Sequence, residues 1–255
     1  MAESIPETWR YLAASVVGSS HLAQNLPCQD AHATAILDDG TIIVAVADGA
    51  GSAKRSYEGA RRAVEASTQC LARDLRAAQP VTAQDCEALL EKAVVTARAA
   101  LQEIAPGEEF NEVATTLLLT IVTPLWLSTI QVGDGAVISR DVSGSLRVLS
   151  QLGQSEYINE TTFLTSSDCL DHLHRATFPS QEVIGLAMLS DGMQLLALRY
   201  ADNTAHDPFF RPLFEFADNP ASTTAELEDF LRSDRVCERT DDDKTLILAV
   251  RHDTQ

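Results

Sequence analysis

Apolar residues along this chain gather into short runs, separated by turn residues, and into two longer stretches of helical periodicity. The short runs are rich in β-branched side chains and are therefore typical of β-strands. They cover residues 12–17, 33–37, 41–47, 115–123, 125–132, 136–140, 184–189 and 245–250. Pro124 separates two of these runs, and we expect a tight antiparallel connection at that point.

Two long helices are predicted between the early strands and the strand at 115–123. Residues 53–77 and 82–104 both place apolar side chains at steps of three and four, which is the period of one helix face. Thr82 is a candidate N-cap for the second helix, and Pro106 lies beyond its end.

The last third of the chain predicts shorter helices at 193–199 and at about 223–232. Between them, the aromatic and proline-containing segment 200–222 is interpreted as an insertion or an irregular packing segment. Strands, a helix pair, more strands and then helices indicate an α+β fold with antiparallel sheets.

Composition limits the class of protein. The 255 residues suffice for one large domain or two small ones, and 45% of them are apolar, enough for a substantial core. No run approaches the ~20 apolar residues of a membrane helix. The acids and the proline near the N-terminus do not match a secretory signal, so a cytoplasmic location is expected. Five widely spaced cysteines predict reduced, packed thiols.

The formal charge of −18 comes from 37 acidic residues against 19 lysines and arginines. Nucleic acid and anionic membranes both require a basic surface, so neither is expected as a partner. A subset of the acids could instead be gathered into a cation site.

Acidic residues recur at the ends of the predicted strands. The three Asp-Gly motifs VADG (46–49), VGDG (132–135) and LSDG (189–192) each follow an apolar run. Asp241-Asp242-Asp243 directly precedes the last strand, and Asp30 lies between two early strands. One Asp-Gly is an ordinary turn, but strands of one sheet bring their ends together, so several such acids converge.

Converging carboxylates repel one another and raise each other's pKa unless a positive charge lies among them. A divalent cation supplies that charge, and ligands that are all oxygen favour Mg²⁺ or Mn²⁺. Glycine has no Cβ, so its carbonyl can approach such an ion closely.

Three other motifs bear on this interpretation. GAGSAK (49–54) is neither a Walker loop nor a dinucleotide-binding loop. A nucleotide-binding protein is therefore a distant third hypothesis, behind the two that are given at the end of this section. Asp241-x-Asp243-x-Thr245 mimics the motif of aspartyl-phosphate phosphatases, but here the strand follows the motif instead of preceding it. The chain contains no G-x-S-x-G elbow, which argues against a serine hydrolase.

Six motifs occur in a fixed order along the chain: CQDA (28–31), VADGAGS (46–52), ATTLLLTIV (114–122), VGDG (132–135), LSDG (189–192) and DDKTLILAV (242–250). In this order and spacing the chain resembles the metal-dependent protein phosphatase family (protein phosphatase 2C), in particular its compact bacterial branch. The resemblance spans about residues 12–251 of a single domain, 1–255.

The resemblance implies a four-layer α/β/β/α sandwich, in which two antiparallel β-sheets are flanked by helix pairs. It also implies Ser/Thr protein phosphatase activity at a two-metal centre, where a metal-activated water hydrolyses phosphoserine and phosphothreonine in one step.

The resemblance assigns roles to individual residues. Asp48 matches the carboxylate that bridges the two metals, and Gly49 matches the residue that offers a carbonyl to the second metal. Asp191 matches a ligand of the first metal, and Asp242, in D-D-K-T, is expected to join it.

Two further acids match family positions with weaker roles. Asp30 matches the acid of an E/Q-D pair that acts directly or through metal-bound water, with Gln29 in place of the more usual glutamate. Asp134 matches a residue tied to an additional metal, so two or three Mn²⁺ or Mg²⁺ ions are expected. Asp241 and Asp243 are expected to be supporting or surface acids.

The chain departs from the family at positions that contact phosphate. Ala50 replaces a histidine that serves as a proposed general acid, and Asn25 replaces a phosphate-binding arginine. His21 is the candidate to take over phosphate contact or proton donation and is counted with Asp48 and Asp191 as catalytic. Lys54 is a second candidate for phosphate contact, against the simpler interpretation of a solvated charge.

Two functional hypotheses follow. The leading one is a Ser/Thr protein phosphatase acting on phosphorylated proteins of a bacterial Ser/Thr kinase system. The alternative is a catalytically weak module with the phosphatase fold that binds phosphoproteins or a regulatory partner, and the missing arginine and histidine motivate it.

Overall fold

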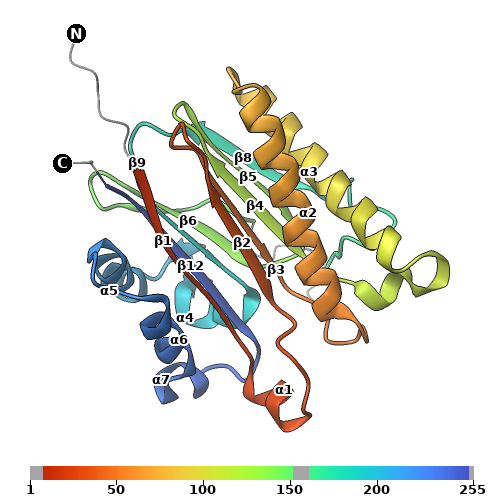
Figure 1. The fold of residues 1–255 in the computed structure, drawn as a ribbon. Helices are drawn as coiled ribbons and strands as arrows, with labels where there is room; N and C mark the ends of the chain where they lie inside the picture. The colour runs from red at the N-terminus through yellow and green to blue at the C-terminus, as the bar shows by residue number, and fades with distance from the viewer. Residues whose placement is uncertain (1–7, 152–160, 253–255) are drawn as a thin grey trace.

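The computed structural model describes residues 8–151 and 161–252, which form two five-stranded antiparallel sheets packed face to face (Figure 1). The first sheet has the strand order β2-β3-β4-β5-β8. Its strands are β2 (Ala31–Ile36), β3 (Ile42–Ala47), β4 (Leu117–Val122), β5 (Trp126–Val132) and β8 (His174–Pro179). The second sheet has the order β1-β12-β9-β6-β7. Its strands are β1 (Thr8–Val16), β12 (Lys244–His252), β9 (Val183–Leu189), β6 (Ala136–Asp141) and β7 (Leu146–Val148).

Helices cover the outer face of each sheet (Figure 1). The long helices α2 (Ser56–Ala77) and α3 (Ala83–Ile104) pack on the first sheet, followed by the 3₁₀ helix η1 (Gly107–Val113). On the second sheet lie α4 (Gln194–Ala197), α5 (Asp207–Asp218), α6 (Thr224–Arg232) and α7 (Asp234–Cys237). The small elements are α1 (Ser19–Ala23), η2 (Asp191–Met193), β10 (Leu198–Arg199) and β11 (Thr204–Ala205).

The apolar core lies in three layers. These layers separate the helices and sheets of the four-layer sandwich that the resemblance predicts. Between the two sheets lie Val44, Leu118 and Met188, among others. Leu71 and Leu101 belong to the layer between the first sheet and its helices. Burying each large apolar side chain contributes roughly 1.5–3 kcal/mol, so these layers dominate the stability of the fold.

The second long helix, α3, begins at the N-cap that the sequence predicts. Thr82 caps α3: its hydroxyl accepts the Asp85 amide, and the Asp85 carboxylate accepts the Thr82 amide. Each partner satisfies one of the amides that a helix start leaves free. The turn after β4, at Pro124, joins β4 and β5 as the predicted antiparallel pair.

The interpretation of 200–222 as irregular is wrong for residues 207–218, which form α5. Pro208 lies in the first turn, where its missing amide costs nothing, and Pro212 removes only one helical hydrogen bond. Phe210 and Phe214 are both buried against the second sheet, and this burial outweighs that loss. The helix predicted at 193–199 is also shorter, because residues 198–199 turn into β10.

Four of the described strands are missing from the sequence prediction, namely β7, β8, β10 and β11. β7 is only three residues long, and β8 lies at the edge of the first sheet, where its burial does not alternate clearly. In the described part of the chain no helix is long and apolar enough to cross a membrane.

Candidate metal centre

A cavity of about 330 Å³ lies where β3, β9 and β12 bring their acidic ends together. It is lined by Ser20, His21, Asp48, Gly49, Ala50, Gly51, Thr116, Asp134, Thr161, Phe163, Asp191, Asp241 and Asp242. The predicted ligands Asp48, Gly49, Asp134, Asp191 and Asp242 all belong to this lining. The acids that share the strand-end pattern are therefore neighbours in space.

Three of the carboxylates form a tight group. Asp48, Asp134 and Asp191 each offer an oxygen, and these oxygens all lie within 4.8 Å of one another. The sequence ranked Asp134 as a residue of an additional site, whereas the fold places it as close as the other two.

Asp48 is held by its backbone. It directly follows β3, its amide donates to the Thr116 hydroxyl at 3.0 Å, and its carbonyl accepts the Thr116 amide at 2.8 Å. The Thr115 hydroxyl donates to the same carbonyl at 2.8 Å. The next residue, Gly49, lies so close to neighbouring atoms that a Cβ would come within 2.8 Å of Ser56. These contacts fix the turn and leave the Asp48 side chain facing the cavity.

Asp134 lies in the turn between β5 and β6. Its neighbours Gly133 and Gly135 have φ values of +87° and +95°, a region that side chains with a Cβ rarely adopt. A Cβ on Gly133 would also come within 2.6 Å of the Thr116 side chain. The Thr161 hydroxyl donates to Asp134 Oδ2 at 3.0 Å and orients the carboxylate.

Asp191 and Asp242 come from neighbouring strands of the second sheet. Asp191 follows β9 at the start of η2, and Asp242 precedes β12. Gly192 allows the two segments to touch, since a Cβ there would lie 2.1 Å from the Asp243 carbonyl oxygen. The buried Lys244 ammonium donates to the Asp242 carbonyl at 3.1 Å, and this hydrogen bond helps to fix the loop that carries Asp242.

Asp30 lies behind the cavity and is not part of its lining. Its Oδ2 accepts hydrogen bonds from the hydroxyls of Ser190 at 2.7 Å and Thr245 at 2.8 Å. Its Oδ1 is buried and has no hydrogen-bond partner in the described part of the chain. Burial, which outweighs the two hydroxyl bonds, and the charges of Asp243 and Asp191 raise the pKa of Asp30 to about 7.

The other acids are perturbed in the same direction. Burial, and then the charges of Asp30 and Asp191, raise the pKa of Asp48 well above its ordinary value. Burial and the charge of Asp191 raise the pKa of Asp134 to about 6. Burial and Asp191 also raise the pKa of Asp242. Each ionised carboxylate therefore destabilises its neighbours in the folded protein without a cation.

The donor set fits a hard divalent cation. Neither lysine nor arginine belongs to the cavity lining, so no side chain of that kind offsets the charge of the acids there. The available donors are carboxylate, carbonyl and hydroxyl oxygens, which suit Mg²⁺ or Mn²⁺. The unpartnered Oδ1 of Asp30 points to the same need for a positive or donating group.

His21 lies at the edge of this cavity, on α1. Its Nδ1 is 2.9 Å from Oδ2 of Asp243, an acid that is 3% exposed. The same carboxylate accepts the backbone amides of Gly18 at 2.6 Å and Gln29 at 2.5 Å. Asp243 is thus a supporting acid, as expected, but its link to His21 was missed because the two are far apart in sequence.

Lys54 does not line the cavity. Its ammonium is 3.3 Å from a Glu112 carboxylate oxygen, and its side chain is 81% exposed, as in the simpler interpretation of a solvated charge.

Three backbone amides of the GAGSAK loop (49–54) are already used in hydrogen bonds within the protein. The amides of Gly49, Ala50 and Ala53 donate to backbone carbonyls, so they are not available to a phosphate group.

The chain is similar in sequence to known proteins. A sequence model described as protein phosphatase 2C matches residues 17–232. Serine/threonine-protein phosphatase 3 of Escherichia coli is 36% identical over an alignment of 257 positions, which covers 95% of this chain and 98% of that protein.

Solved structures share the fold at low sequence identity. A bacterial serine phosphatase superposes with a TM-score of 0.68 and 14% identity, over 96% of this chain and 99% of that one. A serine/threonine phosphatase from Staphylococcus aureus gives 0.65 and 13%, over 98% of both chains. The catalytic domain of the serine/threonine protein phosphatase PstP, crystallised with two manganese ions, gives 0.62 and 16%, over 97% and 100%.

Proposed function

The chain belongs to the protein phosphatase 2C family and is a serine/threonine phosphatase, and we propose that it hydrolyses phosphoserine and phosphothreonine in proteins at a centre of two divalent cations. The observation that carries the proposal is the convergence of Asp48, Asp134 and Asp191 in a cavity lined by neither lysine nor arginine. Cations bound among these three carboxylates would offset their mutual repulsion and would be held where a substrate phosphate can reach them.

Individual residues would share the work of holding the cations. Asp48 would contact both, with Asp191 and Asp242 on one ion and the Gly49 carbonyl on the other. Asp134 would serve an additional, third ion. Mn²⁺ or Mg²⁺ so bound lowers the pKa of a coordinated water and offsets charge on the phosphoryl group during in-line displacement.

Asp30 would act from behind this set of ligands. It lies outside the lining and carries an unpartnered buried oxygen, so it would accept a hydrogen bond from a water on the cation side. The hydroxyls of Ser190 and Thr245 hold the carboxylate in place for that contact.

His21 would serve as the general acid in place of the family's histidine, which is replaced by Ala50 in this chain. Its Nδ1 faces Asp243, which leaves Nε2 as the nitrogen available to a substrate in the cavity. From there it would contact a phosphate oxygen or donate a proton to the departing serine or threonine oxygen. Lys54 is left out of this assignment, because it pairs with Glu112 outside the lining.

Turnover of a phosphothreonine peptide tests the proposal. Activity is expected with Mn²⁺, and its loss is expected on chelation with EDTA and in Asp48→Asn. Asp38→Asn is the matched control, because Asp38 is an exposed acid at the opposite end of the same strand hairpin. Turnover that survives both chelation and Asp48→Asn would refute a metal-dependent reaction.

The alternative of a weak binding module has less support. A module without cations would present phosphate with a cavity of acids and a single histidine, which repels a dianion. Tight phosphopeptide binding without turnover at saturating Mn²⁺ would favour the module. The cognate kinase system and the cytoplasmic location stay predictions, to be tested by phosphoproteomics of a deletion strain and by cell fractionation.

A further inference from the structure

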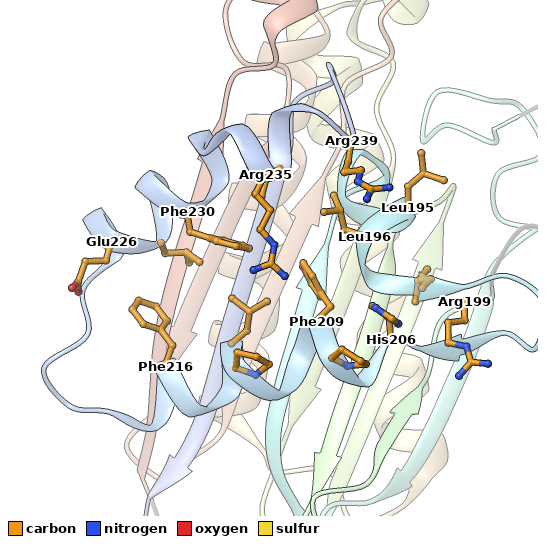
Figure 2. A pocket seen from close by; sticks show the side chains of 16 residues that line it. Leu195, Leu196, Arg199, His206, Phe209, Phe216, Glu226, Phe230, Arg235 and Arg239 are labelled. Atoms are coloured by element: carbon orange, nitrogen blue, oxygen red, sulfur yellow. The ribbon is translucent and has the colours of Figure 1, made fainter.

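A second and larger cavity lies on the other side of the second sheet, away from the acids. It has a volume of about 750 Å³ and forms a groove between α4, β10, α5, α6 and α7 (Figure 2). None of its lining residues belongs to the acidic cavity. The proposed phosphatase reaction gives this groove no role.

The groove has apolar walls. Phe209 and Phe216 come from α5, Phe230 comes from α6, and Leu195 and Leu196 come from α4 (Figure 2). The rings are only partly buried, and the side chain of Leu195 is 72% exposed. Apolar side chains gathered in a concave site leave water in contact with a surface that a ligand could cover.

Arginines line the groove at separate places (Figure 2). Arg199, Arg235 and Arg239 all line it, and Figure 2 shows Arg235 reaching into the groove from α7. Arg199 pairs with Asp202 at 3.2 Å, but the side chains of Arg235 and Arg239 have no hydrogen bond or ion pair with any described residue. In a chain with 37 acids and 19 lysines and arginines, two unpaired arginines beside one apolar groove are unusual.

The groove contains little negative charge of its own. Glu226 is the acid in its lining and lies away from the arginines, beyond Phe216 and Phe230 (Figure 2). Its carboxylate already accepts hydrogen bonds from the amide and the hydroxyl of Thr223, which cap α6. The side chains of Arg235 and Arg239 are therefore open to an anion from outside the chain, whereas Arg199 already pairs with Asp202.

We propose that this groove binds a small amphiphilic anion, with an apolar chain or ring along the phenylalanines and a carboxylate at Arg235, the arginine that reaches into the groove. The volume lies within the ~300–1,000 Å³ typical of small-molecule sites. The chemistry also fits: apolar walls bury the body of the ligand, and a guanidinium group forms charge-assisted hydrogen bonds with its head.

The groove lies next to the Asp191 turn along the chain. Its wall at Leu195 and Leu196 follows directly in the chain from the turn that carries Asp191. A ligand in the groove would therefore contact the segment next to a proposed metal ligand.

Titration calorimetry with dodecanoate, kept below its micelle concentration, tests the proposal by binding and not by turnover. One equivalent is expected to bind to the wild-type chain, and dodecyltrimethylammonium, a cation with the same chain length, is expected not to bind. The variant Arg235→Ala should weaken binding by about tenfold or more. Leu195→Glu should weaken it too, by placing an acid at an exposed position in the wall.

The matched control is Arg211→Ala, since Arg211 is an exposed arginine of α5 outside the groove lining. It should bind dodecanoate as the wild type does, and circular dichroism should show that every variant is folded. The proposal is overturned if dodecanoate does not saturate one site, if Arg235→Ala binds as well as the wild type, or if the cation binds equally. It is also overturned if sedimentation shows a dimer that Leu195→Glu dissociates, because a second copy would then cover the groove.

Discussion

Replacing Asp30 by asparagine should change how the stability of the metal-free protein depends on pH. Asp30 is 8% exposed, and its pKa is raised from an ordinary 3.8 to about 7. A carboxyl with a raised pKa binds its proton more tightly in the folded chain than in the unfolded chain. Stability is therefore lost as the pH rises from the lower to the higher of these two values.

The size of the effect follows from the shift. Roughly three pKa units correspond to about 4 kcal/mol of stability lost above neutral pH, and about 2.5 kcal/mol of that loss falls between about pH 5 and pH 8. Asparagine cannot ionise, so it removes this dependence. Its amide oxygen can still accept from Ser190 and Thr245, but its buried amide nitrogen then takes the place of the unpartnered Oδ1, at a cost of roughly 1–3 kcal/mol at every pH.

Urea unfolding in EDTA at about pH 5 and about pH 8 measures the difference. The loss of unfolding free energy over this range should be smaller in Asp30→Asn than in the wild type by about 2.5 kcal/mol. Asp38→Asn, which alters an exposed acid, should keep the wild-type dependence. An unchanged dependence in Asp30→Asn would refute the argument that burial of this ionised carboxylate destabilises the metal-free fold.

Three further predictions concern the surroundings of the site and the helix layer. Gly18→Ala should lower the thermal stability of the protein and weaken Mn²⁺ binding, because its Cβ would lie 2.3 Å from a main-chain carbon of the facing acidic loop. Gly51→Ala is the control and should change thermal stability little, because its Cβ would have no atom within 4 Å. Asp243→Asn should cost roughly 1–3 kcal/mol in urea unfolding, because one amide oxygen replaces a carboxylate that receives two backbone amides and contacts His21. Phe210→Ala should cost about 3–5 kcal/mol in the same assay, because this fully buried ring anchors α5 to the second sheet.

Much of the fold could be predicted because the strong patterns are local. β3 is buried along its whole length and reads as a continuous apolar run, and α3 carries its own capping box. The segment 207–218 was misjudged because two prolines argue locally against a helix. Burial of Phe210 and Phe214 against a sheet assembled from distant strands decides the outcome, and that contact is not visible in the segment itself.

The site was predictable to the extent that strand ends determine it. Asp48, Asp191 and Asp242 could be placed together because each adjoins a strand of the sandwich. The close approach of Asp134 depends on two glycines with positive φ and on Thr161, so it needed the three-dimensional turn. Contacts between distant loops, such as that of His21 with Asp243, leave no periodic signal in the sequence.

A crystal structure of the protein with Mn²⁺, phased on the anomalous signal of manganese, tests the central claim most directly. At least two manganese peaks are expected in the acidic cavity, both in contact with the Asp48 carboxylate and one of them also with Asp191 and Asp242. Manganese absent from Asp48 at a saturating concentration, or bound only to acids outside this cavity, would contradict that claim.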